Sequence, residues 1–273
     1  MITTTSFKAI IAAQRRHPTE WLWRQCLSIR SQFCEAVVAA GYLSWEQMVS
    51  AACRYRLGAS RLGGVIFWQI DQEERVHDGK VTYYQPDCHR DKGRNPTWVS
   101  ALLRRRNPFP DSPHETSHCF FGAHLISPLN ERLFRPPLTP PNSGGETAIA
   151  VMEGQGGRSP IVVVEAEKTA VILSELYPQY VWLAAGGLGE VQVDKFRPLR
   201  GHKVIMCPDT DPEGVAYKRW HEAAERVMQQ PFWEDSPPIR VSTVLEQHAS
   251  AEQKARKIDL VDFLFDRRTD EKT

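Results

Sequence analysis

Apolar residues early in the chain recur at the spacing of amphipathic helices. In "SQFCEAVVAAGYL", Phe33 and Val37 fall on one helical face, and Gly41 is a helix-stop signal. "SWEQMVSAACRY" follows, and Ser44 stands three residues before Gln47, which is the spacing of a capping box. The pattern therefore predicts two consecutive helices, the second of which starts after Ser44.

From residue 55 onward the pattern becomes typical of strands. "GGVIFWQID" at 63–71 and "GKVTYYQPD" at 79–87 combine β-branched and aromatic residues, with the polar "QEERVHD" between them. Such a pair predicts a β-hairpin or a meander. "NPTWVSALLRRR" then predicts a short helix, and "HCFFGAHLI" at 118–126 is a further apolar segment.

After residue 160, strand-like and helix-like segments alternate. "SPIVVVE" is a continuous apolar run, which is typical of a strand buried on both faces. "EKTAVILSELYPQ" and "EGVAYKRWHEAAERVMQQ" have helical spacing, whereas "YVWLAAGG" and "HKVIMCPD" resemble strands. This alternation predicts an α/β fold with a parallel sheet and covering helices, preceded by a small α+β subdomain and N-terminal helices.

A tract around residues 136–160 is rich in Pro, Gly and Ser, and we interpret it as a linker. A chain of 273 residues is long enough for two domains on either side of it. The other predicted segments are a helical N-terminal segment (1–54), an α+β subdomain (55–135), a parallel-sheet domain (161–230) and a C-terminal extension (231–273).

Composition and charge narrow the functions open to the chain as a whole. Hydrophobic residues make up 41% and charged residues 25% of the chain, which is ordinary for a folded protein. A net charge of +1 gives no overall basic excess, so nucleic-acid binding would have to use local patches. The six cysteines form no C-x-x-C pair, which argues against a zinc ribbon or a disulfide framework. No apolar run is long enough to span a membrane, so we expect a cytoplasmic protein with no membrane partner.

Acidic residues follow two of the predicted parallel strands. Glu165 ends the first of these strands, and Asp209 and Asp211 end the third. If the two strands are neighbours, the three carboxylates converge at the edge where open α/β sheets place their functional groups. The sequence offers no basic partner beside the aspartates, and such a cluster repels itself unless protons or hard cations neutralise it. Mg²⁺ or Mn²⁺ suits these oxygen ligands, which makes all three residues candidate metal ligands and catalytic residues.

The same residues also have less specific explanations. "DTDPEG" is typical of a solvated turn at a strand end, and only the strand-terminal Glu165 favours a metal site. Lys168 lies in the first turn of the following helix, from which a side chain can reach a bound phosphate. An exposed surface lysine is an equally good interpretation.

Both acidic motifs resemble those of the Toprim domain, a metal-binding catalytic module of bacterial-type DNA primases, topoisomerases and certain nucleases. "VVVEAEKTA" is similar to the first motif, a strand that ends in Glu, although Ala166 replaces the usual Gly. "CPDTDPEG" resembles the second motif, Asp-x-Asp followed by a glycine, here Gly214. The resemblance implies that Glu165 is the acid/base or metal-binding glutamate. It implies metal binding by Asp209 and Asp211.

Upstream segments extend the resemblance toward primases. "GGVIFWQID" is similar to a strand in the subdomain before Toprim in bacterial-type primases, and "CFFGAHLI" resembles the segment just before Toprim. The chain resembles primase-like Toprim proteins encoded on mobile elements of Bacteroidetes-type bacteria. This implies Mg²⁺- or Mn²⁺-dependent primer synthesis in DNA replication or mobile-element transfer, with nucleoside triphosphates and single-stranded DNA or another nucleic acid as partners. We find neither a zinc module nor a helicase domain in the sequence, which leaves open whether a helicase or zinc-module protein acts in trans.

Two alternative functions stay open. A Toprim nuclease would use the same carboxylates to cleave phosphodiester bonds. A non-catalytic replication accessory would keep the fold and bind nucleic acid or another protein.

Basic residues before the linker are candidate nucleic-acid contacts. Lys80, Arg94 and Arg56 lie near aromatic positions such as Tyr83, and this combination suits a single-stranded backbone with stacked bases. Lys168 joins them through its position at a helix N-terminus. The alternative interpretation is that the basic residues before the linker simply form a charged, solvent-exposed surface.

Asp259 and Asp262 in "KIDLVDFL" are similar to an acidic segment that often follows Toprim in primase-like proteins. An amphipathic terminal helix with exposed aspartates explains them equally well. The sequence alone does not decide between these interpretations.

Overall fold

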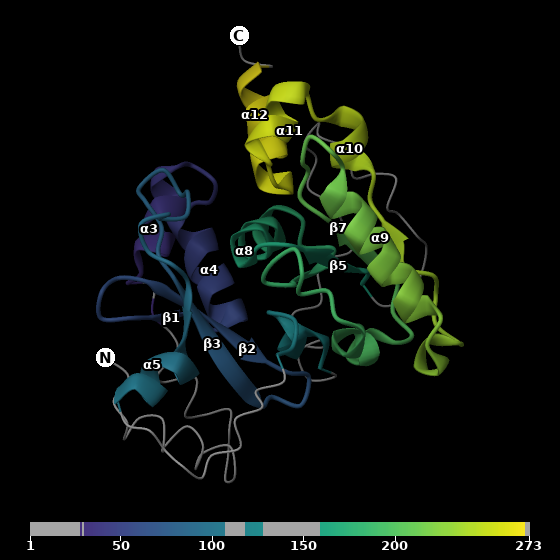
Figure 1. Ribbon diagram of the computed structural model, residues 1–273. Helices are drawn as coiled ribbons and strands as arrows, with labels where there is room; N and C mark the ends of the chain where they lie inside the picture. The colour runs from purple at the N-terminus through teal and green to yellow at the C-terminus, as the bar shows by residue number, and fades with distance from the viewer. Residues whose placement is uncertain (1–27, 29, 107–117, 128–158, 271–273) are drawn as a thin grey trace. The chain divides into compact units, whose positions relative to one another are not determined.

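The computed structural model describes residues 28, 30–106, 118–127 and 159–270 (Figure 1). The chain divides into two compact units, Met1–Glu131 and Arg132–Thr273. Most of the predicted linker, residues 136–158, lies outside the described residues. The finer boundaries proposed from the sequence stay predictions.

The first unit contains an antiparallel sheet with the strand order β1-β2-β3-β4. Its elements are α3 (Gln32–Ala39), α4 (Trp45–Tyr55), β1 (Gly58–Ala59), β2 (Val65–Ile70), β3 (Val76–Thr82), β4 (Thr97–Trp98), α5 (Val99–Arg106) and the 3₁₀ helix η1 (Ala123–Ile126). The predicted pair of helices, the hairpin and the short helix after it are therefore confirmed.

Both predicted helices begin at capped positions. The Ser31 side chain accepts a hydrogen bond from the Cys34 backbone N–H at the start of α3. At the start of α4, Ser44 and Gln47 form the predicted capping box, in which each side chain accepts from the other residue's backbone N–H. These bonds satisfy amides for which the first helical turn has no partner. Helix α4 ends at Arg56, whose φ of 53° is left-handed.

The strand β3 begins earlier than the sequence pattern predicts. It starts at Val76, inside the polar segment that separates the two predicted strands, and Asp78 on this strand is buried. Asp78 is tolerated there because it accepts hydrogen bonds from the Ser100 backbone N–H, at 3.1 Å, and from the Ser100 hydroxyl. The charged side chain thus anchors the first turn of α5 to the strand, which a two-residue alternation cannot reveal.

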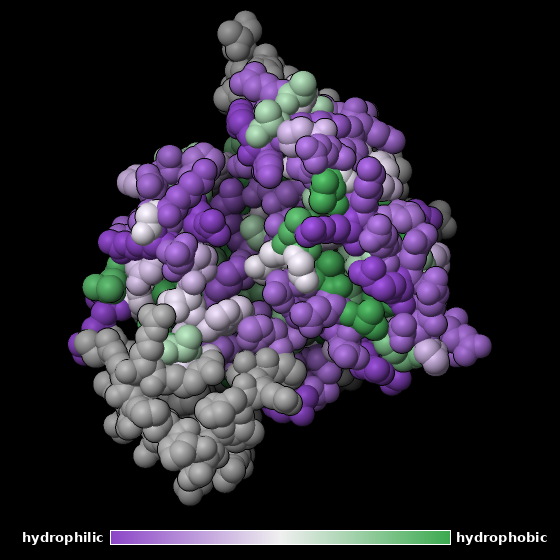
Figure 2. All heavy atoms as spheres, in the orientation of Figure 1, coloured by the Kyte–Doolittle hydropathy of each residue, from purple (hydrophilic) through white to green (hydrophobic). Residues whose placement is uncertain are grey.

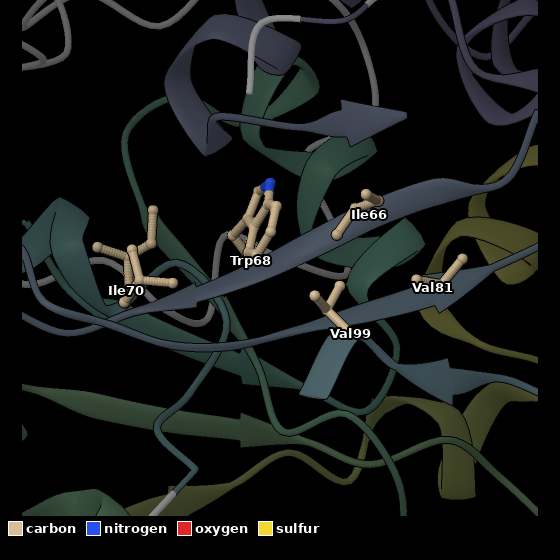
Figure 3. Close-up of a cluster of buried hydrophobic side chains, with 6 residues drawn as sticks. Ile66, Trp68, Ile70, Val81 and Val99 are labelled. Atoms are coloured by element: carbon tan, nitrogen blue, oxygen red, sulfur yellow. The ribbon is translucent and has the colours of Figure 1, made fainter. Parts of the chain in front are cut away.

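The core of the first sheet forms around Trp68 on β2 (Figure 3). The indole belongs to a buried aliphatic cluster from β2, β3 and the start of α5, made up of Ile66, Ile70, Val76, Val81 and Val99. Gly79 lies directly opposite Trp68 on β3, and a Cβ atom at this glycine would come within 2.8 Å of the indole. The glycine inside the strand therefore makes room for the largest side chain of the cluster.

The second unit contains a parallel sheet with the strand order β6-β5-β7-β8. Its elements are β5 (Ile161–Val164), α8 (Glu167–Leu176), β6 (Val181–Ala184), η3 (Val193–Leu199), β7 (Val204–Cys207), α9 (Val215–Met228), η4 (Pro231–Trp233), β8 (Arg240–Val241), α10 (Val244–His248), α11 (Ala251–Arg256) and α12 (Leu260–Asp270). The predicted α/β alternation and the parallel sheet are confirmed.

The central strands of this sheet end level with one another. Val164 on β5 lies opposite Ala184 on β6 and opposite Cys207 on β7. All residues of β5 and β7 are buried, as expected for apolar strands covered on both faces. In Figure 1 these two strands run between α8 and α9. The residues that follow β5 and β7 therefore leave the sheet at one shared edge.

Hydrophilic residues predominate on the face of the molecule in Figure 2, and hydrophobic ones are scattered among them. Within the described residues, the exposed large hydrophobic side chains are Trp45, Leu62 and Leu102. Singly exposed hydrophobic residues of this kind are normal on a protein surface. Among the helices that the structure describes, none is long and apolar enough to cross a membrane.

Candidate active site

Glu165 and Asp209 lie at the carboxyl edge of the parallel sheet. Glu165 directly follows β5, and Asp209 follows β7 after one intervening proline. The two strands are hydrogen-bonded neighbours, which confirms the arrangement on which the prediction of a shared acidic edge depended. The Gly186 backbone N–H donates to the Glu165 carbonyl at 2.9 Å and holds the turn after β5 against the end of β6.

The Asp209 carboxyl lies in an acidic environment. Burial raises its pKa well above the usual value, and the negative charges of Asp259 and Glu165 raise the pKa further. The charge of Lys168 acts in the opposite direction but does not outweigh them. A carboxyl group in this state is stabilised by any cation that reaches it.

Asp211 is used differently from Asp209. Its carboxylate accepts hydrogen bonds from the backbone N–H groups of Glu213, Val215 and Ala216, at 3.0, 3.1 and 2.8 Å. Val215 is the first residue of α9, so Asp211 caps the N-terminus of this helix. Burial would raise the pKa of Asp211, but the three backbone donors outweigh burial and lower it. Its predicted role as a metal ligand stays a prediction.

Lys168 is the basic partner that the sequence analysis did not find beside the aspartates. It lies in the first turn of α8 and is 7% exposed. Its Nζ atom lies 3.2 Å from Asp259 Oδ2 and 3.4 Å from Asp262 Oδ1, and its charge also acts on Asp209. The expectation of an acidic cluster without a basic neighbour is therefore wrong, because the lysine comes from the helix after the first strand.

Asp259 and Asp262 are held at the start of α12. Each accepts a hydrogen bond from the other's backbone N–H, at 2.9 and 3.3 Å, and Asp259 also accepts one from the Thr169 hydroxyl at 2.7 Å. Burial would raise the pKa of Asp259, but the Lys168 charge and the Thr169 hydrogen bond outweigh it. Burial and the neighbouring Asp259 charge raise the pKa of Asp262. Their side chains are 7% and 18% exposed, so the interpretation as exposed aspartates of a terminal helix is wrong.

Thr210, between the two aspartates of the second motif, connects the site to the C-terminal helices. Its backbone N–H donates to the Ile258 carbonyl at 3.2 Å, and its hydroxyl donates to Glu246 Oε1 on α10 at 2.9 Å. Lys254 on α11 donates to the Glu246 carbonyl at 2.7 Å. Residues from α10 to α12 thus form part of the surroundings of Asp209.

Glu165 and Asp209 are the residues that could hold a divalent cation, which would complete its coordination with water and phosphate. In the described ranges, no three His, Cys, Asp or Glu side chains are grouped so that they could hold a metal ion by themselves. Mg²⁺ commonly binds through one or two carboxylates together with waters and substrate phosphates, so two carboxylates are sufficient. The raised pKa of Asp209 agrees with a donor set that a cation would neutralise.

Arg56 and Lys168, two of the predicted nucleic-acid contacts, are buried in ion pairs. Arg56 is 8% exposed and pairs with Glu74. Lys168 pairs with Asp259 and Asp262 as described above. Both cations neutralise internal carboxylates, and a contact with nucleic acid would require these pairs to open.

Arg94 and Lys80 lie near aromatic rings. The exposed Arg94 places its guanidinium carbon 4.7 Å from the centre of the Tyr83 ring. Lys80 on β3 is partly exposed and lies opposite Trp98, whose indole stacks on the His118 ring with a centroid distance of 4.1 Å. Cations and stacked rings of this kind suit single-stranded nucleic acid, and the contact itself stays a prediction.

Sequence reasoning named Lys168, Asp259 and Asp262 but missed that they pair, because the partners lie far apart in the chain. Lys168 and Asp262 are 94 positions apart. An acidic residue before an apolar helix, with a second one three positions later, resembles a capping box and indicates that a helix begins at Asp259. This signal indicates the helix start but not which cation the two carboxylates meet.

The fold and the site define an α/β protein in which the edge of a parallel sheet carries an acidic pair. The chain belongs to the family described as a domain of unknown function, DUF6371, which matches residues 31–133 and 147–210 and so includes Glu165, Lys168 and Asp209. No curated protein matches the chain. Among solved structures, the primase fragment of the bacteriophage T7 primase-helicase protein is similar with 16% sequence identity and a TM-score of 0.39, over 75% of this chain and 69% of that one. A TM-score of this size does not establish a shared fold.

Proposed function

We propose that the protein is a Mg²⁺- or Mn²⁺-dependent nucleotidyl- or phosphoryl-transfer enzyme that acts on nucleic acid. Its most specific form is primer synthesis on a single-stranded template from nucleoside triphosphates. The observation that supports this function is the pair of Glu165 and Asp209 at the ends of neighbouring parallel strands. The resemblance of both surrounding motifs to those of the Toprim domain gives the pair its chemical interpretation.

In this proposal Glu165 and Asp209 share the binding of the cation, and Asp211 has a structural task. Glu165 and Asp209 would hold the divalent cation, which would supply charge neutralisation at the phosphate oxygens. Glu165 would also accept the proton of an attacking hydroxyl group, which is the acid/base role that the resemblance implies. Asp211 fixes the turn between β7 and α9, and so sets the direction of the backbone at Asp209.

The substitution Asp209→Asn tests the proposal. The variant should lose at least about a hundredfold in turnover, because one of two charged ligands is replaced by a neutral group of the same shape. Its melting temperature in metal-free buffer should be equal to or higher than that of the wild type, because the replaced carboxylate is destabilised by its neighbours. Asp194→Asn is the matched control, since the Asp194 side chain is 83% exposed in the same unit.

The assay incubates the protein with a single-stranded DNA template, nucleoside triphosphates and Mn²⁺. Extension products support primer synthesis, and a shortened template supports a nuclease that uses the same carboxylates. Template binding with neither product would indicate a non-catalytic accessory. Wild-type turnover by the Asp209→Asn variant would contradict the whole proposal.

A further inference from the structure

The start of α12 presents two carboxylates to one buried ammonium group. Asp259 and Asp262 contact Lys168 Nζ at 3.2 and 3.4 Å, and the Thr169 hydroxyl holds Asp259 in place at 2.7 Å. The side chains of Lys168 and Asp259 are 9% and 7% exposed. At this depth the position of an ammonium group is decided by the charges that pair with it, because leaving it unpaired is very costly.

Asp209 competes for the same ammonium group. It interacts electrostatically with Lys168 and also with Glu165, Asp259 and Asp262. Lys168 directly contacts both carboxylates of α12. Asp209 and the carboxylates of α12 therefore share the charge of one ammonium group.

We propose that Asp259 and Asp262 are positioning residues for the Glu165–Asp209 site: they pair with Lys168 and offset its charge, so that Glu165 and Asp209 stay available to a divalent cation. This inference rests on the proposed function, since it concerns the cation of the same site. It makes Lys168 an internal counter-ion rather than a nucleic-acid contact. It also makes the start of α12, which lies beyond the residues matched by the family, necessary for cation binding.

The substitutions Asp259→Asn and Asp262→Asn, made together, separate charge from structure. Asparagine keeps a side-chain oxygen that can accept the backbone hydrogen bonds at the start of α12, so the cap of the helix is preserved. The two negative charges that hold Lys168 are removed. The charge of Lys168 should then act on Asp209 without being offset, and the double variant should bind Mn²⁺ at least about tenfold more weakly than the wild type.

A third substitution distinguishes positioning from a structural role. Adding Lys168→Met to the double variant removes the competing ammonium and should restore Mn²⁺ affinity to within about threefold of the wild type. The matched control is Asp266→Asn, because Asp266 lies on the same helix but pairs with Arg256, at 3.2 Å. The control should bind Mn²⁺ like the wild type.

The measurement is a titration of the metal-free full chain with Mn²⁺, in which electron paramagnetic resonance detects the free ion. A wild-type chain that binds no Mn²⁺ would overturn the proposed function and this inference with it. Wild-type affinity in the double variant, or a triple variant that stays as weak as the double one, would overturn the inference alone. If the double variant does not fold, Lys168→Met in the wild-type background decides, since its Mn²⁺ affinity should rise or stay equal, and a decrease would overturn the inference.

Discussion

Asp71 in the first unit and Asp209 in the second show two ways in which a sheet end accommodates a carboxyl group. Asp71 is buried directly after β2, and Asp209 is half-buried just after β7. Asp71 is surrounded by donors and cations, whereas the neighbours of Asp209 include several other acids. The pKa values of the two groups are therefore shifted in opposite directions.

The surroundings of Asp71 compensate its charge almost completely. It accepts hydrogen bonds from the backbone N–H groups of Glu73 and Arg75, at 3.0 and 2.9 Å. Its other oxygen lies 2.7 Å from Arg75 Nε and 2.9 Å from His77 Nε2. Burial would raise the pKa of Asp71, but the His77 and Arg75 contacts outweigh burial and lower the pKa to about 2. The ionised form of this residue therefore closes the hairpin turn between β2 and β3.

The contrast distinguishes acidic residues that stabilise the fold from acidic residues that are candidates for binding a ligand. A carboxylate whose charge is neutralised by its own chain stabilises the folded state. A carboxyl group that its neighbours push toward the protonated form costs stability, and such groups concentrate at functional sites. By this criterion Asp71 is structural and Asp209 is a candidate for chemistry.

Asp71→Ala should have the largest effect on stability. The free energy of unfolding should fall by about 2–4 kcal/mol, because two backbone amides, Arg75 and His77 lose a buried acceptor. Asp209→Asn in metal-free buffer should leave this free energy unchanged or raise it slightly. Urea denaturation measures both, and hydrogen exchange by mass spectrometry assigns the loss to β2 and β3.

Glu73→Ala is the control for Asp71, since Glu73 belongs to the same turn but its side chain is 52% exposed. It should cost less than about 1 kcal/mol, as exposed ion pairs usually do. Equal losses in Asp71→Ala and Asp209→Asn would remove the distinction between the two regions.

The second prediction concerns pH. Because the pKa of Asp71 is lowered, its contribution to stability is present above the ordinary aspartate pKa of about 4, and is lost as the pH falls toward 2. This contribution is about 2 kcal/mol. Because the pKa of Asp209 is raised, its contribution has the opposite sign: it is complete below about pH 4 and is lost as the pH rises through the folded-state pKa.

Unfolding free energies between pH 2 and 7 in metal-free buffer test these signs. Asp71→Ala should flatten the acid limb below pH 4, and Asp209→Asn should reduce the loss of stability above pH 4. A loss above pH 4 that is as large in Asp209→Asn as in the wild type would show that Asp209 is compensated after all.

The features that the sequence predicted correctly are those with short-range signals. The Ser44 capping box and the apolar run of β5 each specify an element through neighbouring residues. β8, only two residues long, has no such pattern and was missed. The early start of β3 was missed because the Asp78 carboxylate binds Ser100, and this contact outweighs the polar character of the segment.

In the candidate site, too, only the features with a local sequence signal were predictable. Placing Glu165 and Asp209 at one edge required only that strands β5 and β7 be neighbours in a parallel sheet. The capping role of Asp211 depends on where the first amides of α9 point, and the pairing of Lys168 depends on how α12 packs on α8. Both features depend on tertiary contacts, which no local sequence pattern specifies.

The smallest predicted effect distinguishes two arginines of the first unit by the same criterion. Arg56 is buried and neutralised by Glu74. Arg94 is half-exposed, and its ion pair with Asp91 is long, at 3.5 Å. Arg94→Ala should weaken binding to single-stranded DNA about threefold and reduce the salt dependence of binding by about one ion, with no change in stability. Arg56→Ala should destabilise the fold, because Glu74 would be left without its cation.

Fluorescence anisotropy of a labelled oligonucleotide at several salt concentrations measures these affinities. Arg94→Lys separates charge from stacking: it should keep the salt dependence of the wild type but lose part of the affinity, because an ammonium lacks the planar face that lies over Tyr83. If Arg94→Ala binds like the wild type at every salt concentration, the exposed arginine is not a nucleic-acid contact. If a folded Arg56→Ala variant instead shows the reduced salt dependence, Arg56 contacts the nucleic acid. In that case an internal ion pair would not identify a structural arginine in this protein.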